Sequence, residues 1–212
     1  KRFYSKVLLY SSFVLMGAII TVSAFSYEVI KVMAGSKEFW GATAIVPVLS
    51  LSVFFVNMKD ITIYGLHFEK KTKIIGLIVF ASTVVALVLN LLLIPAFGIT
   101  GAATATLLSQ VFYWYACHFF AQRAYFIPYE TGKILLIIIT GSILAFTALL
   151  MNDLGLLPRL VLKIAAVISF PFILYVLGFY EAVELQAIRG FFKKWRRLRD
   201  LRSNIKTLVK IQ

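Results

Sequence analysis

Five polar residues recur at helical spacing inside an otherwise apolar stretch, and their chemistry makes them the first candidates for function. These residues, separated by seven, three, four and three positions, are Ser50, Asn57, Asp60, Tyr64 and His67. At about 100° per residue, this spacing places them on one helix face within an arc of about 100°. A carboxylate can accept a proton or a cation, and amide and phenol groups can hydrogen-bond sugar hydroxyls or a diphosphate. The face therefore predicts one wall of a hydrophilic cavity.

The depth of these residues in the membrane leaves open a second interpretation, in which the face lies at the membrane surface instead of lining a cavity. Asp60 lies about 28 Å along a helix that begins at Gly41, because an α-helix rises about 1.5 Å per residue. That depth is near the cytoplasmic edge of the hydrocarbon core, so Asp60 and His67 could be interfacial instead. Lys59 points off the polar face, and it either contributes to the cavity or extends to the inner headgroups.

Three other polar side chains also lie in apolar sequence, where such groups suggest function. Glu28 precedes Lys31 by three residues, which predicts an interfacial ion pair on one helix. Gln110 either bonds a neighbouring helix or lines the cavity. Asn90 is expected to cap or cross-link the turn that follows it.

No residue set in the sequence predicts catalysis, a metal site or nucleotide hydrolysis. His67 and His118 are far apart and have no matching Ser, Cys or metal-ligand cluster. The single cysteine, Cys117, excludes an intramolecular disulfide. A glycine-rich phosphate-binding loop is also missing from the sequence. We therefore expect a protein that is not an enzyme and uses neither a cofactor nor a metal.

The composition indicates that membrane helices position these residues. Of the 212 residues, 61% are hydrophobic and 15% are charged, and the mean hydropathy is +0.91. Soluble domains are about half apolar and about a quarter charged. The net charge of +13 would suggest nucleic acid in a soluble protein. Here the charges lie between and after long apolar runs, as in basic cytoplasmic loops, so no nucleic-acid binding is expected.

Six apolar runs approach or exceed the length of about 20 residues that a membrane helix needs. They are Val7–Ile30, Gly41–Leu66, Ile74–Ile94, Ile99–Ala121, Ile134–Met151 and Leu160–Tyr180. The expected fold is an all-α bundle of six spans over residues 1–180. Pro47 and Pro171 lie inside runs and are expected to kink their helices.

The distribution of Lys and Arg predicts which side of the membrane each loop occupies. With both ends inside, the four inner segments hold 17 of the 22 Lys and Arg residues. The outer segments hold four, which are Lys31, Lys37, Arg159 and Lys163. This excess predicts an N-in, C-in topology.

Residues 181–212 are expected to form a separate cytoplasmic tail. Apolar residues recur there every three or four positions among nine Lys and Arg residues. This pattern predicts a basic amphipathic helix on the anionic inner leaflet. A coiled coil with a partner and a solvated end remain alternatives.

The segment from Asn90 to Ser109 predicts a helical hairpin. Pro95 and Gly98 mark a tight turn, because proline cannot continue the hydrogen-bond ladder and glycine tolerates a left-handed backbone. Gly101, Ala105 and Ser109 follow at intervals of four residues, which gives the next helix a smooth stripe. Small residues allow helices to approach closely in lipid, so packing alone could account for the stripe.

The same segment resembles the polysaccharide (O-antigen) flippases of the multidrug/oligosaccharidyl-lipid/polysaccharide exporter superfamily. The pattern N-x-x-L-I-P-x-x-G-x-x-G-A-A-x-A-T stands without a gap from Asn90 to Thr106. Two shorter stretches are similar to the family's loops, namely Gly35 to Trp40 and Lys70 to Lys73. The resemblance covers roughly residues 1–150.

This resemblance implies an alternating-access transporter of lipid-linked oligosaccharide in the bacterial inner (plasma) membrane. Its twelve to fourteen helices would form two halves around a central cavity. This chain would supply most of the C-terminal half, and the missing N-terminal half would be its partner. A multidrug/cation antiporter of the same superfamily and a non-transporting scaffold subunit are the alternatives. A membrane enzyme would need a polar residue set in a long outer loop, which the sequence lacks.

Overall fold

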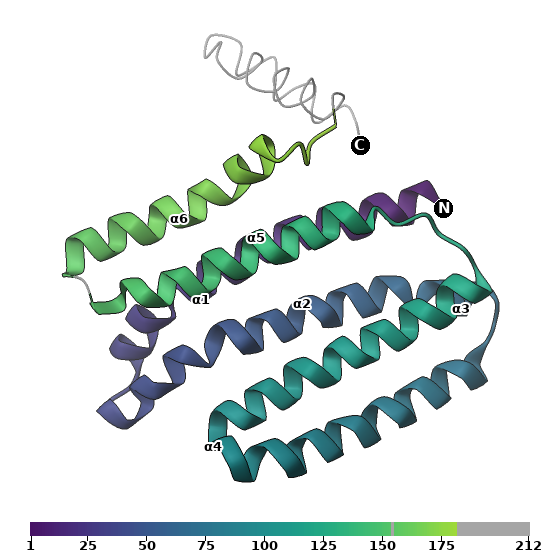
Figure 1. Ribbon diagram of the computed structural model, residues 1–212, viewed down its shortest axis with the longest axis horizontal. Coiled ribbons are helices and arrows are strands. Elements are labelled where there is room, and N and C mark those ends of the chain that lie inside the picture. Colours follow the sequence, from purple (N-terminus) through teal and green to yellow (C-terminus); the bar gives the residue numbers. More distant parts are fainter. Residues whose placement is uncertain (154, 182–212) are drawn as a thin grey trace, which may run out of the picture. The chain divides into compact units, whose positions relative to one another are not determined.

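The computed structural model describes residues 1–153 and 155–181, and every regular element in them is helical (Figure 1). The elements are α1 (Arg2–Met33), η1 (Lys37–Ala44), α2 (Val46–Thr62), α3 (Tyr64–Phe68), α4 (Thr72–Ala124), α5 (Thr131–Leu150), η2 (Met151–Asp153) and α6 (Leu156–Val176). Within these described residues, five helical stretches are long and apolar enough to cross a membrane: α1, α2 with α3, α4, α5 with η2, and α6. The expected all-α membrane bundle is confirmed, but these are five stretches where six spans were predicted.

The longest helix, α4, reverses direction at Gly98 (Figure 1). Its φ of 58° and ψ of −131° lie in a region that is open essentially to glycine alone. The helix therefore forms two arms that fold back as a hairpin, which we call the first arm (residues 72–97) and the second arm (residues 99–124). The predicted reversal is confirmed, but Pro95 lies within the first arm and Gly98 makes the turn.

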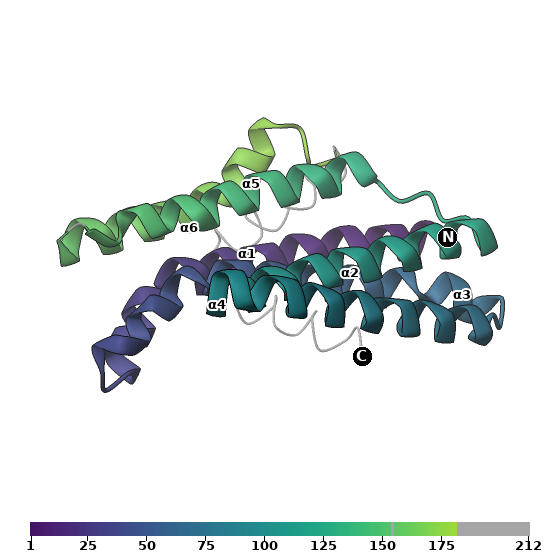
Figure 2. The same ribbon diagram turned by 60° about the horizontal axis from the view of Figure 1, so that its bottom comes forward.

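Packing contacts link α1 through α5 into one unit that spans Lys1–Pro171. Helix α2 packs against α1 and α4, and α1 also packs against α5. Figure 2 shows α5 in a layer beside α1 and α2. The Gly98 turn, η1 and η2 lie at one end of this unit, and Lys1 and α3 lie at the other (Figure 1).

The predicted bounds of two spans, the second and the last, are wrong. The second span does not begin as an α-helix at Gly41, because the chain is a 3-10 helix up to Ala44. Pro47 therefore lies in the first turn of α2, where its missing N–H costs little and no kink results. The last helix begins at Leu156 and ends at Val176, four residues earlier at each end than predicted. Pro171 lies inside α6, as expected.

The described residues after Pro171 belong to a second unit, Phe172–Gln212. The predicted amphipathic tail helix lies outside the described residues. The proposed division at residue 180 therefore stays a prediction.

Candidate functional site

The predicted polar face runs along α2 and α3, and it is partly open in the structure. Asn57 is half-buried and accepts a 3.3 Å hydrogen bond from the hydroxyl of Ser11 on α1. The Asp60 side chain is 59% exposed, and Tyr64 and His67 are exposed. The face is thus shared by α1 and α2, with its Asn57 end anchored between helices and its Asp60 end accessible.

Aromatic contacts extend this face along the same end of α1. The ring of Tyr64 lies 6.0 Å from that of Tyr4 and 6.2 Å from that of His67. Such ring separations are typical of favourable aromatic pairs. Tyr64 is therefore held beside α1 although much of its surface is exposed.

Lys59 lies next to the polar face and pairs with Asp60. Its ammonium is 2.7 Å from Asp60 Oδ1 and lies 4.9 Å from the centre of the Tyr113 ring on the second arm of α4. The Lys59 side chain is 16% exposed, so it is held between α2 and α4 rather than extended into solvent. An ion pair and a cation–π contact together fix the position of the Asp60 carboxylate.

The remaining predicted residues lie on α4, away from this pair. Gln110 is half-buried on the second arm. The amide of Asn90 donates a 2.8 Å hydrogen bond to the carbonyl of Ala86, so it bonds within its own helix rather than cross-linking the hairpin. Gly101 and Ala105 are buried, and a Cβ at Gly101 would meet the Leu93 carbonyl across the turn. The small-residue stripe therefore has a packing role in the hairpin.

The structure also contains an ionic cluster that the sequence did not predict. Lys163 of α6 is fully buried, and its ammonium donates to both carboxylate oxygens of Glu28 at 2.9 and 2.8 Å. It donates a third bond of 2.8 Å to Asn152 Oδ1. Arg159 Nε lies 2.8 Å from Glu28 Oε1, and its terminal nitrogen donates to the Asn152 carbonyl at 3.1 Å. We call these four residues the Glu28 cluster.

This cluster corrects two predictions. Glu28 does not pair with Lys31, whose ammonium instead lies 3.4 Å from the Tyr27 hydroxyl and 4.8 Å from the Trp40 ring centre. Arg159 and Lys163 are not loop cations, because both belong to α6. They are four residues apart and follow Pro158, which is common in a first helical turn. The spacing of four residues and the preceding proline could have predicted that Arg159 and Lys163 lie on one face of a helix.

A second charged group lies at the opposite end of α1. Glu130 accepts ion pairs from Lys6 at 2.8 Å and from Lys133 at 2.7 Å. Burial opposes ionisation of Glu130, but the hydrogen bonds from these two lysines outweigh it and hold its pKa below the ordinary value. Burial raises the pKa of the neighbouring Tyr129 to about 12. Glu130 thus remains ionised and ties the start of α5 to α1.

In the part of the chain that the structure describes, no group of three or more His, Cys, Asp or Glu side chains could hold a metal ion. The Glu28 cluster and the Asp60–Lys59 pair differ in how accessible their carboxylates are. In the Glu28 cluster, the carboxylate lies between two cations, and the Tyr27 ring covers Arg159 at 4.8 Å. Asp60 is more accessible than Glu28, so it is the better candidate for contact with a solute.

Comparisons with known proteins bear on the class of protein. No family model matches the chain, and no solved structure matches it. It is 26% identical over 191 residues to an uncharacterized membrane protein, MJ1068, of Methanocaldococcus jannaschii. The match covers 89% of this chain and 37% of that protein, so the chain spans well under half the length of its relative. Together with the five apolar helices, this similarity identifies the chain as a helical membrane protein.

Proposed function

We propose that this chain forms part of a transporter that moves lipid-linked oligosaccharide across the membrane by alternating access. The observation that carries the proposal is the accessible polar face of α2, where Asp60 is 59% exposed within an otherwise apolar span. A polar group is costly against lipid, so such a face favours contact with a water-filled path. The resemblance of Asn90 to Thr106 to the polysaccharide flippases suggests the class of substrate.

The reversal at Gly98 supports the same proposal at the level of the helices. If each arm of α4 crosses the membrane, the chain makes six crossings and both ends lie on the same side, which the distribution of Lys and Arg predicts to be the inner side. The resemblance then implies a bacterial inner-membrane protein in which a second set of helices closes the cavity. The α2 face would supply one wall, and an ion-coupled rocking of the two halves would open the cavity to either side in turn.

In this proposal, each residue of the face has a distinct task. Asp60 binds a cation or a proton, and its Lys59 partner keeps the carboxylate in place. Asn57 and Tyr64 offer neutral donors and acceptors for sugar hydroxyls or a diphosphate. The charge of Asp60 would therefore couple the movement of a cation or proton to transport, and the neutral groups would contact the substrate.

Replacing Asp60→Asn in the full-length protein tests the proposal. We expect glycan export to fall by about tenfold or more, because loss of one buried or bound charge typically costs more than about 1.4 kcal/mol. The measurement is the amount of surface polysaccharide in cells that depend on the variant, at matched protein levels in the membrane.

The matched control is Glu69→Gln, which removes an exposed charge in the segment just before α4. It should leave export unchanged. Normal export by the Asp60→Asn protein would contradict a role for Asp60. Normal export together with lost resistance to cationic drugs would instead support the antiporter alternative.

A further inference from the structure

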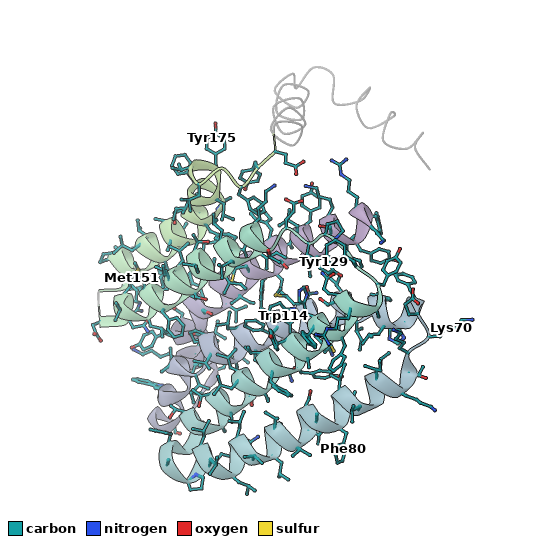
Figure 3. The ribbon with its side chains drawn as sticks, turned by 45° about the vertical axis from the view of Figure 1, so that its right-hand side comes forward. Lys70, Phe80, Trp114, Tyr129, Met151 and Tyr175 are labelled. Carbon is teal, nitrogen blue, oxygen red and sulfur yellow. The ribbon has the colours of Figure 1, made fainter. Side chains whose placement is uncertain are left out.

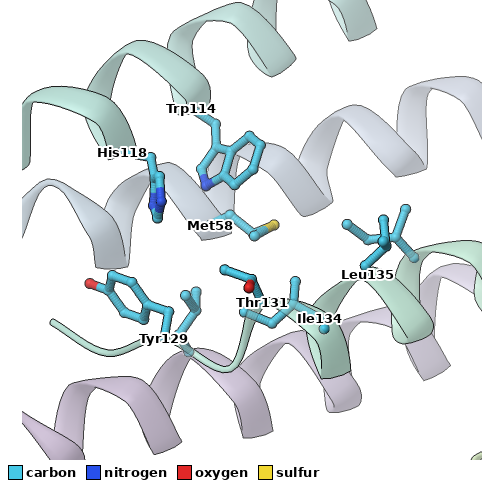
Figure 4. Close-up of a pocket in the computed structure, with 10 residues that line it drawn as sticks. Met58, Trp114, His118, Tyr129, Thr131, Ile134 and Leu135 are labelled. Atoms are coloured by element: carbon cyan, nitrogen blue, oxygen red, sulfur yellow. The ribbon is translucent and has the colours of Figure 1, made fainter. Parts of the chain in front are cut away.

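An apolar cavity of about 300 Å³, open on one side, lies between helices at the end of the unit that carries Tyr129 (Figure 4). Its walls come from α1, α2, the second arm of α4 and α5, and they include Leu8, Met58, Trp114, His118, Ile134 and Ile138. Figure 4 shows Trp114 and His118 on one side, with Thr131, Ile134 and Leu135 on the other. Helix α5 thus leaves a space beside the second arm instead of packing on it.

The walls of this cavity favour an apolar guest over water. They expose almost only carbon atoms. An apolar cavity of about 150 Å³ in a protein interior can remain dry and accept benzene, whereas bound water needs two to four polar partners. A space twice that size suits a hydrocarbon segment and lies at the lower end of the range for ligand pockets.

One polar group in the wall indicates that the guest carries a hydrogen-bond acceptor. The indole nitrogen of Trp114 is buried and has no hydrogen-bond partner among the described residues. A buried donor without an acceptor is costly. An ester carbonyl next to a hydrocarbon chain would supply that acceptor without filling the cavity with water.

The mouth of the cavity opens where a membrane lipid can reach it. Leu135 lines the cavity and is 56% exposed. Gly132 also lines it, and a Cβ there would meet nothing within 4 Å. The mouth lies in the first turns of α5, at one end of a helix long and apolar enough to cross a membrane, so an acyl chain could enter it from the edge of the hydrocarbon layer.

We propose that this cavity binds one acyl chain of a membrane glycerophospholipid. The chain enters past Gly132 and lies between Trp114 and Ile138, and its ester carbonyl accepts a hydrogen bond from the Trp114 indole. The occupied cavity bridges α4 and α5, so the lipid acts as packing material between them. This site requires only that the helices lie in a bilayer, and it does not depend on the transport function proposed above.

Photolabelling of the full-length protein tests the proposal. The protein is reconstituted in vesicles of phosphatidylcholine that carries a diazirine in one acyl chain, irradiated and mapped by peptide mass spectrometry. We expect label on Met58 and Trp114, which face the cavity, and also on Phe80. Phe80 lies on the first arm of α4, is 69% exposed and points outward from the bundle (Figure 3), so it reports ordinary contact with the bilayer.

Two variants with the same chemical change separate the cavity from the bulk lipid. Gly132→Leu fills the mouth, and we expect label on Met58 and Trp114 to fall by about tenfold, the loss expected when two or three methylene groups can no longer be buried. Gly76→Leu makes the same change in α4, where a Cβ also meets nothing within 4 Å, and it should leave all label unchanged. Label on Phe80 should be equal in both variants, which also reports that each is folded in the bilayer.

A further variant tests the polar contact. Trp114→Phe retains an aromatic ring but removes the N–H, and cavity label on Met58 should fall by about fivefold through the loss of one hydrogen bond. Leu135→Phe narrows the mouth one turn further along α5, and it should also lower the label on Met58 while Gly132 stays unchanged.

Three results would overturn the proposal. The first is label on Phe80 with none on Met58 or Trp114. The second is cavity label that is the same in Gly132→Leu as in the parent protein. The third is displacement of cavity label, but not of Phe80 label, by a polyprenyl phosphate, which would assign the cavity to an isoprenoid chain.

Discussion

Lys163 is the residue whose environment departs most from expectation. Its side chain has no exposed surface, yet it is a cation in a helix of a membrane protein. Three hydrogen bonds, two to the Glu28 carboxylate and one to Asn152, use every donor of its ammonium. Removal of one partner from such a group leaves the other charge buried, which is more costly than the pair itself is stabilising.

The first prediction concerns this pair. Lys163→Met should lower the free energy of unfolding by about 3 kcal/mol, because Glu28 then loses its closest cation. Glu28→Gln should have a similar effect, and the double variant should be clearly less destabilised than the sum of the two. The measurement is denaturant-induced unfolding in detergent, followed by circular dichroism.

Lys31→Met is the matched control for this cycle. Lys31 is exposed and contacts only Tyr27 and Trp40 in the described part of the chain. Its loss should change stability by less than about 0.5 kcal/mol, as for most surface substitutions. If the loss in free energy of unfolding of the double variant equals the sum of the losses of the Glu28 and Lys163 variants, the two residues are not coupled.

The Glu28 cluster also shows why part of the candidate site could not be predicted from the sequence. Glu28 and Lys163 are 135 positions apart, and their contact depends on how α1 and α6 pack. The polar face of α2 depends instead on spacing within one helix, which the sequence contains. That face was therefore found, whereas the Lys163 contact required tertiary structure.

At the scale of elements, the reversal in α4 depends on two glycines with different roles. Gly98 turns the chain through a backbone conformation that other residues avoid. Gly101 lets the second arm begin close to the Leu93 carbonyl of the first. Both requirements are local, so the sequence predicted the hairpin. The 3-10 helix before α2 was missed because its last four residues, Gly41 to Ala44, are uncharged and lead without a break into the apolar residues of α2.

The second prediction follows from the close approach at Gly101. Gly101→Ala should destabilise the protein by about 2 kcal/mol, because the added Cβ forces the two arms apart and overpacking of this kind costs about 1–3 kcal/mol. Gly76→Ala is the matched change in the same helix, where a Cβ meets open space. It should stabilise by up to about 1 kcal/mol, since alanine favours a helix over glycine. Thermal unfolding in detergent measures both, and equal effects would refute the close-contact role of Gly101.

At the scale of the whole molecule, the apolar surface indicates which helices meet lipid. The first arm of α4 is the most exposed part of the helices that could cross a membrane, and its large apolar side chains include Leu77, Phe80, Leu87 and Leu91. Soluble proteins rarely expose so continuous an apolar surface. We therefore expect this arm to face hydrocarbon and the Ser11 and Asn57 side of α1 and α2 to face the polar path proposed above.

The number of crossings depends on whether both arms of α4 span the bilayer. Each arm has about 26 residues, or about 39 Å at 1.5 Å per residue, which exceeds the hydrocarbon thickness of about 30 Å. If both arms cross, Lys70 and Phe126 lie on one side of the membrane and Ile99 lies on the other. All three residues are exposed, so a cysteine at any of them should react with a thiol reagent that reaches it.

The last prediction uses that arrangement. In a Cys117→Ser background, which removes the single buried cysteine of the chain, the variants Lys70→Cys, Ile99→Cys and Phe126→Cys are made singly in the full-length protein. A membrane-impermeant maleimide added to intact cells should label only Ile99→Cys, and inverted vesicles should reverse the pattern, because Lys and Arg accumulate on the cytoplasmic side. The Lys70 and Phe126 variants control for each other, since they flank the two arms at the same end. Labelling of all three from one side would mean that the hairpin enters and leaves the bilayer on that side, and the six-crossing topology would then be wrong.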